Sequence, residues 1–383
     1  MEKVYFNFSY LALKLLGSGL YSNPWNAISE LVANGFDAGA SDVYVYLEKN
    51  ENGHSIIEIF DNGTGMDYKD LVSKYALIGR NKRNDPSDFS SDNPSGRKGI
   101  GKLATLYLSN NVNLISKKNN RQTFWNINLT ETSDDERPSI NEIDSTGVNI
   151  RSFNKWNSIK HGFFIQMLDV NLTGLGEKTA AALANRLSDF YILNSNVRRI
   201  WVSFCSNDEK TDFTLAKKSI AYKNFYALFN NSNVRFDGFE NQRLKIKTKY
   251  EELKIGYPSV ELDAGSFNVS GKKEFVNNSG EMVEKKYKLV GWIGIHTSIN
   301  VEEARQNDAS FVKNKVTSPN RLRLYVRGKL AVENFLDYIK THKRFQIILK
   351  AKSVLTFLMT MSSLTLRPQI DNSFQKRMKE SNC

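Results

Sequence analysis

The first half of the chain alternates between helical and strand-like spacing of its apolar residues. Asn23-Pro24 has the pattern of an N-cap followed by proline at the first helical position, and helical spacing then runs through WNAISELVANGFDA to Gly39. Period-two alternation follows in DVYVYLE and SIIEIFD, which the turn-prone ENGH separates. The strands that this pattern predicts are 42–48, 55–61, 111–116, 122–129 and 163–168, and the further helices are 67–77, 177–190 and one from Gly101.

Long polar stretches interrupt this pattern in both halves of the chain. Residues 78–99 are rich in Gly, Asn, Asp, Ser and Pro, and loops of this length are usually functional or disordered. A polar, Lys-rich stretch covers 242–290. Around it, the expected elements are strands 289–296 and 322–327 and a helix 331–341. We therefore expect one domain over 1–205 and a second over 206–343.

The end of the chain changes character at Arg344. Apolar and small polar residues mix there without a clear period. Read in a neighbouring codon frame, the stretch can spell an acidic string, although codon degeneracy gives such a reading freedom. Our hypothesis is that 344–383 is an irregular, frameshifted tail of a truncated chain, which the sequence of the gene can test.

Composition narrows the class of protein. The chain has 383 residues, 40% hydrophobic and 25% charged, which is an ordinary globular balance. It has no apolar run of about 18 residues, so no membrane span is expected, and its opening does not resemble a signal peptide. The two cysteines, Cys205 and Cys383, lie far apart and suit a reducing compartment, so we expect a cytoplasmic protein.

The formal net charge of +12 favours polyanions as partners. Nucleic acid is the obvious candidate, whereas a solvated basic surface gives the same number. Charge describes non-specific attraction rather than function, so both interpretations stay open at this point.

Polar residues share one face of the first predicted helix. Glu30, Asn34 and Asp37 are spaced i, i+4 and i+7. A solvated helix face gives the same pattern. A carboxylate can also deprotonate water as a general base, and an amide oxygen is a hard ligand of the kind Mg²⁺ prefers.

Two glycine-rich segments follow. Asp61-Asn62-Gly63-Thr64-Gly65-Met66 stands directly after an apolar strand, where the glycines permit a tight turn and Asp61 can accept a hydrogen bond from an exocyclic amine. Alone, such a segment is more often an ordinary turn. The segment GRKGIGK, 96–102, ends the long loop at a helix start, where backbone N–H groups can converge on an anion. It lacks the spacing of a P-loop.

Taken together and in this order, four stretches resemble the GHKL ATPase superfamily, which includes DNA gyrase, the ninety-kilodalton heat-shock chaperones, histidine kinases, MutL repair proteins and MORC ATPases. They are ELVANGFDA (30–38), DNGTGM (61–66), IGRNKR (78–83) and GRKGIGKLA (96–104). The opening of the chain is more similar to prokaryotic MORC-like and chaperone-like members than to gyrase or MutL.

The resemblance implies a role for each matching position. Glu30 is the implied general base, Asn34 the Mg²⁺ ligand and Asp61 the acceptor for the adenine amine. The other implied nucleotide contacts are Gly63, Gly65, Met66, Ile78, Gly79, Lys82, Gly96, Lys98, Gly99, Ile100, Gly101, Lys102 and Leu103. In the second domain, Arg327 and Lys329 are candidates for a γ-phosphate contact, although exposed basic residues at a strand end are the commoner case.

The resemblance also implies an architecture and a mode of action. The fold expected for 1–205 is an α/β two-layer sandwich, with a mixed, mainly antiparallel sheet, helices on one face and a lid over 78–100. A ribosomal-protein-like αβ domain is expected to follow. ATP and Mg²⁺ are the implied cofactors, and lid closure with ATP-dependent homodimerisation is the implied switch, acting on DNA or in defence. The alternatives are a chaperone-like ATPase with protein clients and a nucleotide sensor or scaffold that does not hydrolyse ATP.

One position departs from the family pattern. Phe163 follows Gly162 where the family usually has a threonine whose hydroxyl reaches toward the adenine-binding aspartate. Loss of that hydrogen bond to Asp61 costs about 1 kcal/mol. The sequence therefore predicts weakened ATP affinity, unless a backbone group or water replaces the hydroxyl.

Overall fold

The computed structural model divides the chain into two compact units, Met1–Lys217 and Lys218–Cys383. The residues it describes are 9–21, 23–50, 55–78, 101–130, 138–170, 172, 179–191, 193, 198–206, 209–216, 222–229, 266–267, 270–276, 281–288, 291–296, 323–326 and 328–333. The expected lid beyond Ile78 and the expected tail 344–383 lie outside this part of the chain.

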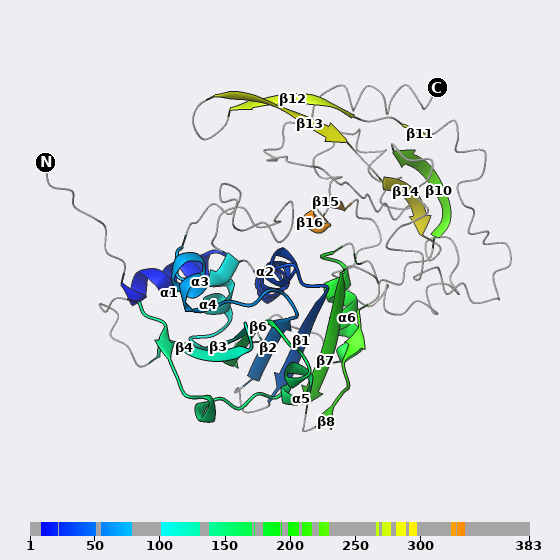
Figure 1. The fold of residues 1–383 in the computed structure, drawn as a ribbon. Coiled ribbons are helices and arrows are strands. Elements are labelled where there is room, and N and C mark those ends of the chain that lie inside the picture. Colours follow the sequence, from blue (N-terminus) through cyan, green and yellow to red (C-terminus); the bar gives the residue numbers. More distant parts are fainter. Residues whose placement is uncertain are drawn as a thin grey trace, which may run out of the picture. The chain divides into compact units, whose positions relative to one another are not determined.

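A nine-stranded mixed sheet forms the body of the first unit (Figure 1). The strand order is β5-β4-β3-β6-β2-β1-β7-β8, and β9 also pairs with β7. Neighbouring strands are antiparallel except β1 and β7, which run parallel. The strands are β1 (Asp42–Lys49), β2 (Ser55–Asp61), β3 (Asn111–Lys118), β4 (Arg121–Asn128), β5 (Asn141–Glu142), β6 (Gly162–Val170), β7 (Arg199–Ser206), β8 (Glu209–Lys210) and β9 (Thr214–Leu215). The expectation of a mainly antiparallel α/β fold is confirmed.

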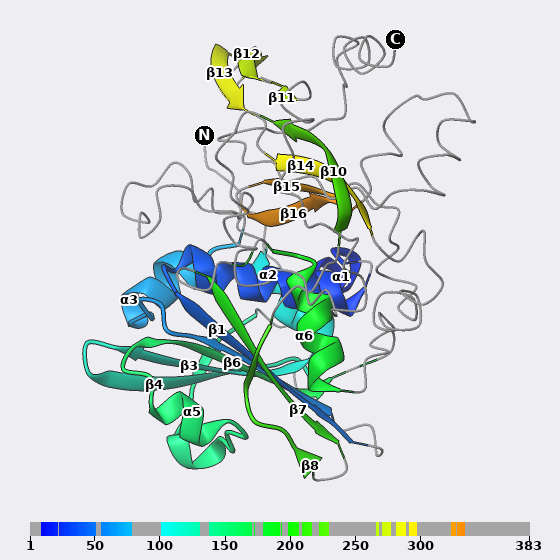
Figure 2. The same ribbon diagram turned by 90° about the vertical axis from the view of Figure 1, so that its right-hand side faces the viewer.

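Helices and short helical turns pack around this sheet. They are α1 (Tyr10–Gly19), α2 (Pro24–Asp37), α3 (Tyr68–Asp70), a π-helical turn (Leu71–Tyr75), a 3₁₀ turn (Gly101–Leu103), α4 (Ala104–Leu108), a 3₁₀ turn (Ser145–Gly147), α5 (Phe153–Asn157) and α6 (Ala180–Ser188). Figures 1 and 2 show α2 on one side of the sheet and α5 on the other. The sequence pattern indicated neither α1 nor α5.

Helix α2 forms as its sequence predicts. The Asn23 side chain accepts a 3.0 Å hydrogen bond from the Asn26 N–H and satisfies one of the unpaired donors of the first turn, and Pro24 takes the first helical position. The helix ends before Gly39, whose φ of 79° suits glycine. The side chains that it buries include Ile28, Leu31, Val32 and Phe36.

The sheet presents two different faces because neighbouring residues of a strand point to opposite sides. On the near face, a Cβ added at Gly35 of α2 would stand 2.9 Å from the Val43 side chain and 3.1 Å from Asp61 Cβ, so the helix backbone almost touches the strands. On the far face, Trp156 of α5 packs on Phe60, with ring centroids 5.9 Å apart. The near face is thus the one that α2 covers, and the far face is the one that α5 covers.

Small sheets of two or three strands make up most of the described part of the second unit. They are β10 (Tyr222–Phe229), β11 (Ser266–Phe267) and β14 (Gly291–His296) in one sheet, β12 (Ser270–Val276) with β13 (Met282–Lys288), and β15 (Leu324–Val326) with β16 (Lys329–Val332).

Two expectations for this unit need correction. The prediction of a helix over 331–341 is wrong at its start, because Ala331 and Val332 belong to strand β16. Residues 334–341 lie outside the described residues. The β12–β13 ribbon falls in the Lys-rich stretch where no strand was expected. Its Lys272–Glu284 pair, 2.8 Å apart, is exposed on both sides, so the ribbon offers little apolar alternation to detect.

None of the helices in the described residues is both long and apolar enough to cross a membrane.

Candidate functional site

The polar face of α2 meets the start of the helix that follows the long loop. Glu30 and Asn34 are half-buried on α2, one turn apart. A Cβ added at Gly101 would stand 3.1 Å from Glu30 Oε2 and 3.6 Å from Asn34 Oδ1. The absence of a side chain at Gly101 therefore brings bare backbone against the carboxylate and the amide. Two segments that the long loop separates in the sequence therefore lie next to each other.

Asp61 lies at the end of β2, buried beneath α2. Its Oδ1 accepts a 2.8 Å hydrogen bond from the Gly63 N–H, and the Phe163 N–H also donates to the carboxylate. Burial raises the pKa of Asp61 to about 6, although these donors and the nearby His161 act to lower it. The backbone of Phe163 thus supplies the hydrogen bond that its side chain cannot. The Phe163 ring packs on Tyr75, with centroids 5.6 Å apart.

The turn after Asp61 is held by groups that the sequence analysis did not single out. The Met66 N–H donates to Ser116 Oγ at 2.6 Å, and His161 Nδ1 lies 2.6 Å from the Gly63 carbonyl oxygen. Gly65 has a φ of 65°, and a Cβ there would overlap the Lys117 carbonyl of β3. The family motif alone could have drawn attention to His161, since this residue directly precedes the Gly-Phe departure.

Asn62 in the same turn has a structural role. Its side-chain Oδ1 accepts from the N–H groups of Ser41 and Asp42, each at 3.0 Å. Asp42 is in turn bound by Arg199 and Trp201 of β7, and its pKa is lowered to about 2, because these hydrogen bonds outweigh the effect of its burial. The turn that carries Asp61 is therefore fixed to β1 and β7.

Lys102 follows Gly101 and points toward the end of the π-helical turn. Its Nζ donates to the carbonyl oxygens of Lys74, Tyr75 and Leu77, at 2.8, 2.5 and 2.7 Å. A cation at this position satisfies carbonyl groups that the last helical turn leaves unpaired. Lys102 thereby fixes the segment that leads to Ile78, where the described part of the loop ends.

The structure describes only some of the other residues that were expected to contact the nucleotide. Leu103 is buried, so its side chain serves the core, and Ile78 is exposed. Lys329 stands on β16 of the second unit, half-buried. Several expected residues lie outside the described part of the chain: Gly79, Lys82, Gly96, Lys98, Gly99, Ile100 and Arg327.

No cluster of three or more His, Cys, Asp or Glu side chains that could hold a metal ion occurs among the described residues.

Comparison with known proteins finds one family that matches part of the chain. Residues 21–162 match the family of histidine kinase-, DNA gyrase B- and HSP90-like ATPases. This match supports a place for residues 21–162 in the GHKL ATPase superfamily. The matched range begins just before α2, ends at Gly162 and encloses Glu30, Asn34, Asp61 and Gly101.

Individual relatives match between 113 and 209 residues of the chain. A candidate type II restriction enzyme, HgiDII of Herpetosiphon aurantiacus, is 39% identical over 113 residues, which is 29% of this chain and 18% of the relative. The DNA mismatch repair protein MutL of Endomicrobium trichonymphae is 27% identical over 209 residues, 52% of this chain and 33% of the relative. MutL of Borreliella afzelii is 27% identical over 124 residues, which is 32% of this chain and 20% of the relative. The chain thus matches a third or less of the length of these relatives.

Proposed function

We propose that the first unit binds ATP with Mg²⁺ and hydrolyses it. The observation that carries this proposal is the close approach of Gly101 to Glu30 and Asn34, because a carboxylate, a side-chain amide and a backbone segment without a side chain lie close together there. Glu30 is proposed to orient the attacking water and accept its proton. Asn34 is proposed to ligate the metal ion, which when bound neutralises phosphate charge.

The residues present fit a nucleotide at both ends of the site. At the proposed phosphate end, Gly101 leaves a space next to Glu30 Oε2 that a side chain would fill. At the base end, Asp61 is 7% exposed and offers a carboxylate that is fixed by two backbone N–H groups. A buried acceptor held in this way discriminates between bases through their exocyclic groups, because a base without a matching donor leaves it unpaired. Gly63, Gly65 and Met66 line this end in the proposal.

Lys102 suggests how nucleotide binding is coupled to the long loop. Its ammonium bonds three carbonyl oxygens at the start of that loop. A contact between Lys102 and phosphate requires it to exchange some of these oxygens for phosphate oxygens, which would release the segment ending at Ile78. We propose that this exchange initiates lid closure and that closure permits pairing of two chains, with DNA as the setting. The MutL and restriction-enzyme relatives and the net charge of +12 support that setting.

Hydrolysis and binding measured on the same variants test the proposal. Wild type should bind ATP and turn it over with Mg²⁺. Glu30→Ala should keep binding and lose turnover by at least about 100-fold, since general-base catalysis contributes about 10²–10⁴-fold. Asp61→Asn should lose binding. A wild-type protein that binds ATP without any turnover would establish the nucleotide-sensor alternative, and one that does not bind ATP would refute both.

A further inference from the structure

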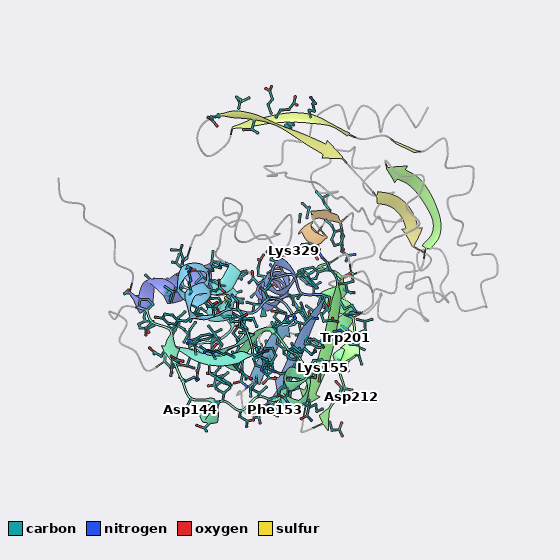
Figure 3. The ribbon with its side chains drawn as sticks, viewed as in Figure 1. Asp144, Phe153, Lys155, Trp201, Asp212 and Lys329 are labelled. Atoms are coloured by element: carbon teal, nitrogen blue, oxygen red, sulfur yellow. The ribbon has the colours of Figure 1, made fainter. Side chains whose placement is uncertain are left out.

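A second concave site lies on the far face of the sheet, away from Glu30 and Asn34. It is an open pocket of about 610 Å³. In Figure 3, Lys155, Trp201 and Asp212 gather where α5 meets β7. The pocket lining comes from residues 151–155, from Trp201 of β7 and from residues 210–213.

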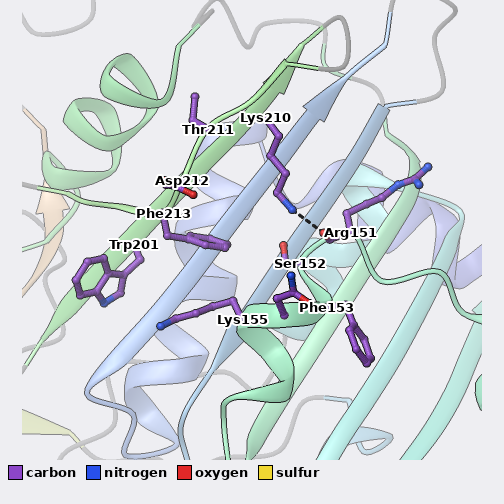
Figure 4. A pocket seen from close by; sticks show the side chains of 10 residues that line it. Arg151, Ser152, Phe153, Lys155, Trp201, Lys210, Thr211, Asp212 and Phe213 are labelled. Carbon is purple, nitrogen blue, oxygen red and sulfur yellow. Dashed lines mark hydrogen bonds between the residues drawn. The ribbon is translucent and has the colours of Figure 1, made fainter.

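A buried carboxylate fixes one wall of this pocket. Glu58 of β2 is fully buried and accepts from the Arg151 N–H at 2.7 Å, the Ser152 N–H at 2.8 Å and Gln166 Nε2 at 2.9 Å. Lys210 Nζ donates to the Arg151 carbonyl oxygen at 2.6 Å, which the dashed line in Figure 4 marks. Backbone and side-chain hydrogen bonds therefore hold the wall in place, so the pocket needs no ligand to form it.

Aromatic rings form the floor. Trp201 is stacked with Tyr44 at a centroid distance of 6.2 Å and an interplanar angle of 12°. Phe213 stands edge-on to Tyr44 at 5.5 Å and 88°. Both Trp201 and Phe213 are only half-buried, so part of each ring faces the pocket. Planar ligands stack favourably on such surfaces.

Positive charge surrounds the rings. Lys155 Nζ lies 5.0 Å from the Tyr44 ring centroid, and Lys210 Nζ lies 4.9 Å from that of Tyr46. The lining also contains one carboxylate, Asp212, and Arg151, whose guanidinium pairs with Glu48 at 3.3 Å. Figure 4 shows Lys155 and Lys210 on opposite sides of Phe213, with the Arg151 side chain directed away from them. The pocket combines flat apolar surface with two ammonium groups at its edge.

We infer that this pocket binds a nucleobase and its adjoining phosphate, presented by single-stranded nucleic acid. The rings stack the base, and Lys155 and Lys210 attract the phosphates on either side, the combination used by proteins that bind single strands. Asp212 can accept a hydrogen bond from a base N–H group. Duplex nucleic acid does not fit, because its bases are stacked and paired and cannot enter a pocket. An acidic peptide would satisfy the ammonium groups without using the rings.

Binding of a fluorescent oligothymidylate of about 12 nucleotides to the full chain, measured by anisotropy without ATP, tests the inference. In Lys155→Gln/Lys210→Gln, affinity should fall about tenfold, and the slope of log K against log salt should decrease in magnitude by about 1.4. The matched control is Lys69→Gln/Lys160→Gln, which removes the same charge from exposed positions outside the pocket lining. Equal losses in the two double variants would show diffuse attraction and overturn the inference.

Tryptophan fluorescence separates stacking from electrostatics. Trp201 is half-buried, whereas Trp25, Trp125 and Trp156 are 4%, 1% and 1% exposed. The oligonucleotide should quench wild type and leave the fluorescence of Trp201→Phe nearly unchanged. Unchanged wild-type fluorescence during binding would overturn the inference. So would equal binding of duplex DNA, or equal displacement by polyglutamate, which would instead indicate an acidic polymer or peptide.

ATP binding by the same variants keeps this test independent of the proposed function. Lys155→Gln/Lys210→Gln should bind ATP as wild type does, because both residues are on the far face. A wild type that failed to bind ATP would refute the ATPase proposal and leave the oligonucleotide result standing.

Discussion

The two faces of the sheet are made by the same strands and yet have opposite construction. On the near face, Gly35 and Gly101 remove side chains where α2 approaches Asp61 and where the loop approaches Glu30. On the far face, Tyr44, Phe60 and Trp156 fill the space with large rings. The near face therefore allows backbone segments to approach closely, whereas the far face buries apolar area and offers rings for stacking.

The two buried carboxylates of β2 show the same contrast. Asp61 points to the near face and Glu58, three residues earlier, points to the far face. Burial raises the pKa of both groups, and both accept backbone N–H groups. Glu58 also accepts from a side chain and serves to hold a loop, whereas Asp61 is proposed to serve a ligand. A buried carboxylate is therefore not by itself a sign of function.

Adding one methyl group at Gly162 should have the largest effect on the near face. Gly162 has a φ of 153°, and its Cβ would overlap the Asp61 carbonyl oxygen. Gly162→Ala should lower the free energy of unfolding by about 3 kcal/mol or more, because the backbone strain alone costs about 1–3 kcal/mol and β2 must also shift. Chemical denaturation measures it. Gly147→Ala is the control, since nothing lies within 4 Å of its added Cβ; equal effects would contradict the close approach.

The pH dependence of stability should reveal Asp61. The pKa of Asp61 is about 6 in the folded protein and near 3.8 in the unfolded chain, so the folded state binds the proton more tightly. This contribution to stability is complete below about pH 4 and is lost as the pH rises through 6, in total about 3 kcal/mol. Asp61→Asn should remove that part of the pH profile. ATP affinity should change in the opposite sense and increase through pH 6, as the carboxylate ionises. A profile unchanged in Asp61→Asn would contradict the raised pKa.

Substitutions of Glu58 should separate the two faces. Glu58→Ala leaves the N–H groups of Arg151 and Ser152 without their acceptor, and unsatisfied buried donors cost about 1–3 kcal/mol each. We expect a loss of about 3 kcal/mol at most, since water can reach the exposed Arg151. Oligonucleotide binding should weaken and ATP binding should persist. Glu58→Gln should cost less than Glu58→Ala, because its amide oxygen can still accept from the Arg151 N–H and from Gln166 Nε2, although its NH₂ group then faces the Ser152 N–H. Loss of ATP binding in a folded Glu58→Ala protein would contradict the separation.

The sequence predicted the near face better than the far face, for physical reasons. Helix α2 carries its own cap and apolar face, and its bounds are local properties of the chain. The family resemblance could predict that Glu30 lies near Gly101, because the helix motif and the glycine-rich motif follow one another in the order typical of the family. The far-face pocket joins the loop before α5 to the segment after β7, and no local pattern links residues so far apart.

Other misses have local causes. The five-residue helix α5 is too short to show helical periodicity, and β7 lies parallel to β1, a pairing that connects distant segments. The three carbonyl partners of Lys102 could not be foreseen, because backbone acceptors leave no signature in the sequence. The roles of Glu30, Asn34 and Asp61 stay predictions until the variants are measured.

Phe163→Thr should have the smallest effect and tests the one departure from the family pattern. The sequence predicted weakened ATP binding, because a hydroxyl that serves Asp61 is absent. In the structure the Phe163 N–H already donates to that carboxylate, as does the Gly63 N–H. Restoring the hydroxyl should therefore change the Kd for ATP by less than about threefold, below the roughly fivefold that 1 kcal/mol represents. The variant also loses the contact with Tyr75, so its unfolding should be measured alongside. A tenfold gain in affinity would mean that the backbone hydrogen bond does not replace the hydroxyl.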